Sequence, residues 1–417
     1  MRVLLSDGSG LTARQSALLL ARAGHRVGVL SSTPIGVTRF THAVAAWHRS
    51  PRLGADPHRW LTAALARYAA GRYEALLPTQ DQVAALSWAG ARGLLHDLAT
   101  VVPGWEALVA VFDKPSAHRT LTALGLPRPE TVIVRRLAGL VTWDTFPVYL
   151  KLPLSTAASG VIRVTNPSEL AAAVARLTAW GAFEEGAPGV LVEREVAGPL
   201  TIVQGLFDHG RLLAVHACER VAEGVGGAAS HKRSVEPAGY RPLLLALGEH
   251  LSWHGPLTLD VIEGPAGPVV VDVNPRLVEP MNAHAAGVDL PGVMLRLARG
   301  ETPAPIEDAR PGVRTHQALV GLLGSAARGR GAAAREALRI ASSSGDYRDS
   351  AEESTPTRGD WRARIPLAVV GGGLLVRPRF AHSLASEAIA HYAITPEGWR
   401  TLVGTPGDAP NGSVGEG

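Results

Sequence analysis

Cysteine is almost absent from this sequence of 417 residues, in which Cys218 stands alone. A single cysteine excludes an intramolecular disulfide framework and a zinc cluster built from cysteines. Nothing therefore indicates an oxidising compartment, and we expect a cytoplasmic protein. The fifteen histidines include no His-Glu-x-x-His pattern, so the local sequence gives no support to a zinc site either.

Long apolar runs and blocks of like charge are missing as well. The longest apolar stretch, around 365–376, is too short and too rich in glycine to span a bilayer, and the amino terminus lacks the basic region of a secretion signal. The 41 basic residues face 37 acidic ones, and no five basic residues follow one another. We expect no membrane span and no nucleic-acid partner. The net charge of +4 suits anionic small molecules or, equally, a scattered solvated surface.

What the chain does contain is enough apolar material for a packed interior. Apolar types make up 46% of the residues and charged types 19%, which excludes a disordered chain. The length exceeds that at which a single core stops growing, so two or three subdomains are expected. Strands and helices both recur along the chain, which predicts an α/β protein, or α+β when the whole chain is considered.

Residues 1–110 have the pattern of a small open parallel α/β unit, because strands and helices alternate there. The predicted elements are a strand over 2–6, a helix over 11–23, a strand over 27–30, a helix over 60–70 and a strand over 75–77. The sequence 8–13 loosely matches a dinucleotide fingerprint, but the second strand ends without the acidic residue that NAD requires. An ordinary tight turn is favoured. Thr79, Gln80 and Asp81 follow the strand 75–77 and could contact a substrate there.

Strand-rich patterns dominate beyond Asp113, and they predict two further units, 111–195 and 196–310. The second of these reads as antiparallel. A C-terminal region follows over 311–403, and its polar stretch 326–364 is predicted to be a surface excursion. The last residues, 404–417, are predicted to be a disordered tail.

The strongest chemical signal is a predicted hairpin over 257–276. With its turn centred on Ala266, Asp260 falls opposite Asp272, and Asn274 points to the same face as Asp272. Two facing carboxylates in apolar strands require a compensating cation, and oxygen ligands indicate Mg²⁺ or Mn²⁺. The alternative interpretation is a set of surface residues beside a Pro-Gly turn.

Two lysines form a second signal. Lys114 follows Asp113 and precedes a predicted helix over 115–124. Lys151 ends a predicted strand and precedes a loop of small residues whose N–H groups and hydroxyls could close over phosphates. Either lysine alone could equally be a surface residue. A third, weak signal is the predicted strand 190–195, in which Glu193 could accept a hydrogen bond from an adenine amino group, with Val196 after it offering its backbone. An ordinary alternating strand would look the same.

In this order and spacing, the three signals resemble the ATP-grasp superfamily, particularly the branch of biotin carboxylase and the carbamoyl-phosphate synthetase large subunit. The resemblance covers roughly 1–300. It implies a pre-ATP-grasp α/β domain followed by two antiparallel-sheet lobes that clamp ATP. It also implies formation of an acyl phosphate that a nucleophile then attacks.

Carried over by position, the resemblance assigns a role to each of these residues. Lys114 and Lys151 correspond to phosphate-binding lysines, and Glu193 and Val196 to the adenine contacts. The phosphate loop corresponds to Ser155, Thr156, Ser159 and Gly160, the metal ligands to Asp260, Asp272 and Asn274, and the arginine that steadies the reacting group to Arg276. A basic segment with Lys232 and Arg233 is predicted to be a mobile loop that meets the γ-phosphate and a substrate carboxylate, although a solvated basic turn explains it as well.

Three departures from the family pattern bear on function. Aspartates stand at the first two metal positions, where the family usually has glutamates. The loop 155–160 holds one glycine, and Leu200 occupies a position where the family often has an acidic ribose ligand.

Despite these departures, the resemblance implies an ATP-dependent carboxylate-amine ligase with small-molecule substrates. A homodimer is left open. A carboxyphosphate-using carboxylase and a non-catalytic ATP-binding module are the alternatives.

Overall fold

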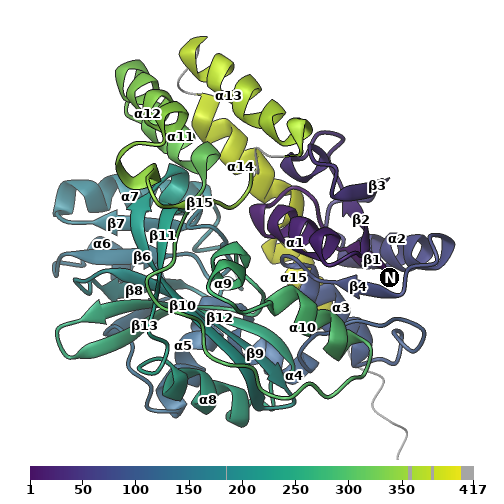
Figure 1. Cartoon of the computed structure of the whole chain (residues 1–417). Helices are drawn as coiled ribbons and strands as arrows, with labels where there is room; N and C mark the ends of the chain where they lie inside the picture. The colour runs from purple at the N-terminus through teal and green to yellow at the C-terminus, as the bar shows by residue number, and fades with distance from the viewer. Residues whose placement is uncertain (185, 356–358, 377–379, 405–417) are drawn as a thin grey trace, which may run out of the picture.

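The computed structural model describes residues 1–184, 186–355, 359–376 and 380–404. Three sheets organise this part of the chain: an N-terminal four-stranded sheet, a second four-stranded sheet in a small lobe, and a seven-stranded sheet in a large lobe. In Figure 1 the N-terminal unit is purple, and the yellow C-terminal helices lie beside it. The α/β class and the two antiparallel lobes are confirmed. None of the described helices has the length and apolar character needed to cross a bilayer.

The N-terminal unit is the expected open parallel sheet, in the order β3-β2-β1-β4. Its strands are β1 (Arg2–Leu5), β2 (Arg26–Ser31), β3 (Val44–Arg49) and β4 (Ala75–Leu77). Its helices are α1 (Leu11–Arg22), α2 (Pro57–Ala70), α3 (Gln82–Gly90) and α4 (Trp105–Phe112), with the short turn η1 (Val37–Arg39). Strand β3 and helices α3 and α4 were not predicted from the sequence.

The turn between β1 and α1 is built around a buried carboxylate. Oδ2 of Asp7 accepts hydrogen bonds from the backbone N–H groups of Ser9 (2.8 Å) and Gly10 (3.2 Å) and from the Ser9 hydroxyl (2.7 Å). Burial nevertheless raises the pKa of Asp7 to about 6 because the hydrogen bonds compensate only in part. The contribution of this turn to the stability of the fold is therefore expected to depend on pH.

A pH dependence of stability follows from Asp7. A carboxyl group whose pKa is higher in the folded than in the unfolded state stabilises the fold below its unfolded pKa, and this contribution is lost as pH rises through about 6. We expect Asp7→Asn to remove this loss and to increase the free energy of unfolding at pH 7 by on the order of 2 kcal/mol. Denaturant unfolding of both proteins between pH 4 and pH 7 measures it, and equal slopes against pH would contradict it.

The small lobe is an antiparallel sheet in the order β5-β8-β6-β7 with a core of its own. Its strands are β5 (Thr131–Val134), β6 (Val148–Lys151), β7 (Val161–Val164) and β8 (Val190–Arg194), and its helices are α6 (Leu137–Val141) and α7 (Pro167–Ala179). Helix α5 (Lys114–Ala123) precedes it. Buried Leu150, Leu177 and Val192 fill the interior of this lobe.

The large lobe is the sheet β13-β12-β9-β10-β11-β14-β15. Its strands are β9 (Leu200–Asp208), β10 (Arg211–Glu223), β11 (Ala229–Val235), β12 (Gly255–Gly264), β13 (Gly267–Asn274), β14 (Arg314–His316) and β15 (Ala351–Glu352). All neighbours are antiparallel except β14 and β15. Its connections contain η2 (Val225–Gly227), α8 (Arg241–His250), α9 (Met281–Ala285) and α10 (Leu290–Ala298).

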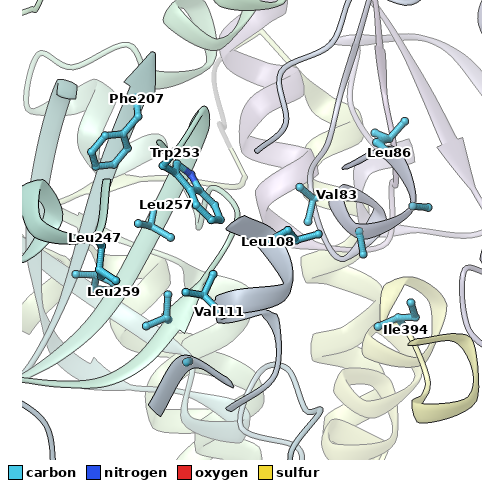
Figure 2. Close-up of a cluster of buried hydrophobic side chains, with 14 of the residues drawn as sticks. Val83, Leu86, Leu108, Val111, Phe207, Leu247, Trp253, Leu257, Leu259 and Ile394 are labelled. Atoms are coloured by element: carbon cyan, nitrogen blue, oxygen red, sulfur yellow. The ribbon is translucent and has the colours of Figure 1, made fainter. Parts of the chain in front are cut away.

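One apolar core joins the N-terminal unit to the large lobe. Figure 2 shows Val83 and Leu108 of the N-terminal unit near Trp253 and Leu257 of the large lobe, with Ile394 of the C-terminal region in the same cluster. The two units therefore form one block. The small lobe has a separate core, which permits it to move against this block.

The C-terminal region corrects one expectation. The stretch 326–364 was predicted to be a surface excursion, but Glu353, Ser354 and Thr355 are buried, and β15 extends the large sheet. Polar residues usually indicate exposure to solvent, but in this stretch Glu353 bonds to buried residues of other units. The region also contains α11 (Ala318–Ala327), α12 (Arg330–Ser342), η3 (Gly345–Tyr347), η4 (Trp361–Ala363), α13 (Arg364–Val376), α14 (Phe380–Tyr392) and α15 (Pro396–Gly404). Of the predicted tail, 405–417 lies outside the described residues.

Candidate active site

The β12–β13 hairpin places two carboxylates opposite each other, as predicted. Asp260 pairs with Asp272, and Asn274 pairs with Thr258. Gly264 pairs with Gly267, so the centre of the turn lies just before Ala266, where it was expected. Val271 is an extra, bulged residue in β13, and this bulge brings Asp272 back into register with Asp260. Without that bulge, a one-residue shift would turn Asp272 away from Asp260.

The electrostatics of this pair favour a cation. Burial, and then the charge of Asp272, raise the pKa of Asp260 to about 6. Burial also acts on Asp272, but the positive charges of Lys114 and Lys151 outweigh it, and the pKa of Asp272 lies below its usual value. Asp272 is thus held in its charged form, whereas Asp260 retains a proton more easily. A cation bound next to both carboxylates would favour the charged form of Asp260 as well.

Lys114 is placed by the start of a helix. Asp113 caps α5 by accepting a hydrogen bond from the Ser116 N–H (2.8 Å), so that Lys114 is the first helical residue. Its Nζ lies 3.1 Å from Oδ1 of Asp272 and donates to the backbone oxygen of Ser155 at 3.4 Å. Lys114 therefore connects the carboxylate hairpin with the small-lobe loop.

Lys151 lies at the end of β6, where it meets Glu193 diagonally across the β6–β8 ladder. Its Nζ is 2.5 Å from Oε2 of Glu193 and 2.7 Å from the backbone oxygen of Val271, the bulged residue. Burial raises the pKa of Glu193, although Lys151 opposes this shift. Lys114, Glu193 and Asp272 line one narrow cleft, whereas Val196 lies outside that lining, in the connection to β9.

The loop between β6 and β7 reaches the large lobe. Oγ1 of Thr156 accepts a hydrogen bond from Nη2 of Arg276 at 2.7 Å, and the Ser159 hydroxyl donates to the backbone oxygen of Thr156 at 2.8 Å. Ala157 and Ala158 have positive φ values of 50° and 59°, which is unfavourable for alanine. Gly160 closes the loop, since its backbone oxygen accepts from the N–H of Leu152 at 2.8 Å.

Contact between this loop and Arg276 provides a prediction. We expect Thr156→Val to loosen the loop, because valine preserves shape but cannot accept the hydrogen bond of the guanidinium. Backbone amides of 155–160 should exchange with deuterium about tenfold faster, which corresponds to a lost interaction of about 1.4 kcal/mol. Thr165→Val, at the surface of the same lobe, is the control. Equal exchange rates in the two variants would show that the hydrogen bond between Thr156 and Arg276 does not hold the loop.

Arg276 joins three parts of the chain. Its guanidinium donates to Oδ1 of Asn274 at 3.0 Å, to Thr156 of the small lobe, and to Oε1 of Gln80 at 2.9 Å. Asp81 lies 4.0 Å away. The carboxyl end of β4 therefore lies next to Arg276, a contact that was not predicted from the sequence. The substrate contact expected there stays a prediction.

The basic segment around Lys232 is not a loop. Residues 229–235 form strand β11, in which Lys232 points inward with 2% of its side chain exposed and Arg233 points outward with 52% exposed. Lys232 bonds to Glu279 and, at 2.7 Å, to Glu353. The prediction of a mobile basic loop is wrong, because strand alternation separates the two neighbours and buried carboxylates bind one of them.

Sequence reasoning missed the acids that surround Lys232. Glu279 follows Arg276 by three residues and has a φ of 47°, an uncommon conformation for a glutamate. Glu353 accepts hydrogen bonds from Gln15 (2.9 Å) and Thr315 (2.6 Å). No local pattern could have identified Glu353, whose partners come from α1, β11 and β14.

A parallel α/β unit followed by two antiparallel lobes is the arrangement of the ATP-grasp fold, and this chain has that fold. Among solved structures, the chain is similar to the biotin carboxylase domain of Hydrogenobacter thermophilus 2-oxoglutarate carboxylase, in complex with MgADP, ADP and bicarbonate, with a TM-score of 0.57 and 17% identity over 75% of this chain and 73% of that one.

Two enzymes of other activities are similar as well. An L-amino acid ligase from Bacillus licheniformis matches with a TM-score of 0.54 and 16% identity over 75% of this chain and 78% of that one. N5-carboxyaminoimidazole ribonucleotide synthetase from Thermotoga maritima matches with a TM-score of 0.53 and 16% identity over 75% and 79%. At these identities the likeness establishes the fold. No protein-family model and no curated protein matches the sequence.

Proposed function

We propose that this protein is an ATP-dependent carboxylate-amine ligase that releases ADP and phosphate. The observation that carries the proposal is the opposition of Asp260 and Asp272 next to Lys114 and Lys151, at the junction of the two lobes. Such an arrangement suits a nucleotide whose phosphates bring both negative charge and a divalent metal ion. The ATP-grasp neighbours support the proposal, since they include an amino acid ligase.

The three oxygen-bearing side chains of the hairpin fit a magnesium ion. Asp260, Asp272 and Asn274 share one face of the ladder. Burial, and then the charge of Asp272, raise the pKa of Asp260, and a bound cation would stabilise both carboxylates in their charged form. Mg²⁺, or Mn²⁺, prefers a few such ligands and completes its coordination with phosphate oxygens and water. When bound, the metal ion would neutralise charge on the phosphates.

The chain's own residues would then orient and shield the reactants. In the proposed reaction a carboxylate oxygen attacks the γ-phosphorus, ADP leaves, and the amine displaces phosphate from the acyl phosphate with loss of a proton. Lys114 and Lys151 would neutralise the phosphoryl oxygens, and Arg276 would hold the carboxylate next to them. The loop 155–160, already joined to Arg276 through Thr156, would exclude water from the acyl phosphate.

Glu193 and Val196 are proposed to contact the adenine. Glu193 lines the cleft and is already bonded to Lys151, so it would orient this lysine at the same time. The connection after β8 would offer the backbone of Val196. Lys232 and Arg233 do not form a mobile loop that could meet the γ-phosphate, because Lys232 is bonded to two glutamates and Arg233 to surface Glu219.

Release of ADP and phosphate from Mg-ATP tests the proposal directly. The purified chain is supplied with a panel of carboxylates, each with and without amine co-substrates, and compared with Asp272→Asn. We expect turnover that requires a carboxylate and an amine. Turnover with bicarbonate alone would favour the carboxylase, and protection of ATP without turnover would favour a non-catalytic binding module.

We also propose a cytoplasmic location and a homodimer. Cell fractionation tests the location, and light scattering tests the oligomeric state.

A further inference from the structure

Two histidines and an aspartate meet at the end of the large sheet, away from the carboxylate hairpin. Gly255 of β12 pairs with Phe207 of β9, so that His254 reaches the level of Asp208. His209 and Gly210 form the turn between β9 and β10, with φ values of 47° and 89°. The ladder register therefore brings His254 next to Asp208 and His209, which lie more than forty residues earlier in the sequence.

Ligand atoms of the three side chains lie close together. Nδ1 of His209 lies 2.9 Å and Nδ1 of His254 lies 3.6 Å from Oδ1 of Asp208. One ligand atom from each residue lies within 4.8 Å of the others. In a tetrahedral zinc site, bonds of about 2.0–2.2 Å separate the ligand atoms by roughly 3.3–3.6 Å. The two imidazole rings are stacked, with centroids 4.2 Å and planes 29° apart. A rotation of the exposed His209 side chain would therefore bring both nitrogens to face one ion.

The remaining contacts leave these atoms available. Nδ1 of His254 is buried and has no hydrogen-bond partner among the described residues. Arg211 occupies the other carboxylate oxygen of Asp208 at 3.1 Å and also donates to the backbone oxygen of Pro303. Arg211 thus orients Asp208 from outside and leaves Oδ1 directed at the two imidazoles. The Gly210 N–H donates to the backbone oxygen of Trp253 at 2.7 Å and fixes the turn.

We propose that Asp208, His209 and His254 bind one transition-metal ion, for which Zn²⁺ is the best match. Two imidazoles and a carboxylate are ligands that zinc accepts, whereas Mg²⁺ prefers oxygen alone. His209 is 75% exposed, so a water molecule can complete the tetrahedron. The ion would fasten the β9–β10 turn to the start of β12.

This site is separate from the proposed nucleotide site. Asp260 pairs with Ile202, six residues along β9 from Asp208, which corresponds to about 20 Å of strand. Short histidine motifs do not reveal this site, because Asp208 and His209 lie at the end of β9 whereas His254 lies just before β12. Only the register of the sheet brings them together. The proposal does not depend on the enzymatic activity.

Zinc titration of the metal-free, untagged chain tests the proposal. Excess Mg²⁺ is present throughout to occupy the oxygen site, and calorimetry and equilibrium dialysis measure affinity and stoichiometry. We expect one Zn²⁺ per chain, a rise in Tm, and at least a tenfold loss of affinity in His254→Gln and in His209→Ala. His209 is exposed, so the second variant is expected to fold normally.

His96→Ala is the matched control, since His96 forms an exposed pair with Asp97, and no third ligand joins the pair among the residues that the structure describes. It should bind zinc like the unmodified chain. Substoichiometric binding, or equal affinity in His254→Gln, His209→Ala and His96→Ala, would overturn the proposal. Co²⁺ provides a second readout, because a tetrahedral site gives visible absorption that the two ligand variants should lose.

Discussion

Replacing Asp272 with asparagine is expected to lower carboxylate-dependent ADP release by two to three orders of magnitude, the scale on which the loss of one preorganised electrostatic group slows an enzyme. Asparagine keeps the shape of the side chain and one oxygen but removes the negative charge. Lys114, whose Nζ lies 3.1 Å and 3.3 Å from the two carboxylate oxygens, would lose its counter-charge at the same time. Coupled measurement of ADP at saturating Mg-ATP gives the effect.

The control for this prediction is Asp308→Asn. Asp308 is an aspartate of the same chemistry on the surface, where it pairs with Arg241, and its loss should leave turnover within about twofold. Titration with Mn²⁺ in place of Mg²⁺ adds a second measurement, because Asp272→Asn should raise the metal concentration needed for half-maximal activity. Full activity with unchanged metal dependence would remove the hairpin from the proposed site.

Lys232→Met is expected to destabilise the fold by roughly 3–5 kcal/mol, the usual cost of leaving a buried charge without its partner. The ammonium group bonds to Glu279 and Glu353, and both carboxylates would remain in the interior without it. Burial works against the charge of Lys232, but the two glutamates outweigh it and raise its pKa. Lys232 therefore contributes stability below its unfolded pKa, and this contribution is lost only as pH rises through the higher folded value.

The pH dependence of this variant has a definite sign. Burial raises the pKa of Glu353, and with the opposing Lys232 removed we expect a further rise. A raised carboxyl pKa stabilises the fold below the unfolded pKa and ceases to do so as pH rises, so the variant should regain stability relative to the original chain as pH falls toward about 4. Denaturant unfolding at several pH values measures this recovery.

Arg233→Met provides the matched control for Lys232→Met. Arg233 is the next residue of the same strand, points to solvent and pairs with Glu219, so its replacement should cost less than about 1 kcal/mol. Adding Glu353→Gln to Lys232→Met should restore part of the lost stability, since it removes one of the unpaired charges. Equal losses for Lys232→Met and Arg233→Met would show that the buried network does not stabilise the chain.

The order of elements and the main chemical signals could be predicted from the sequence because they depend on local rules. Strand β4 has the predicted bounds, since an apolar run and flanking turn residues mark it. The opposition of Asp260 and Asp272 also followed from the hairpin pattern. A helix was predicted from Pro115, a residue typical of a helix start, and the structure begins it one residue earlier, at Lys114.

Other features depended on contacts between distant segments. The bulge at Val271 maintains the register of the two aspartates and offers its carbonyl to Lys151, and no turn rule specifies it. The C-terminal stretch appeared solvent-exposed because its residues are polar. Glu353 is nevertheless completely buried, since Lys232, Gln15 and Thr315 satisfy its carboxylate.

The sequence by itself determined the alternation of strands and helices, the carboxylate hairpin and the lysines, because side-chain periodicity and turn chemistry act over a few residues. Only the tertiary structure decided that Arg276 joins Gln80 to Thr156, that Lys232 is buried while Arg233 is exposed, and that two histidines meet Asp208. The physical reason is that such contacts arise when sheets and lobes pack, and packing brings together residues that no local pattern links.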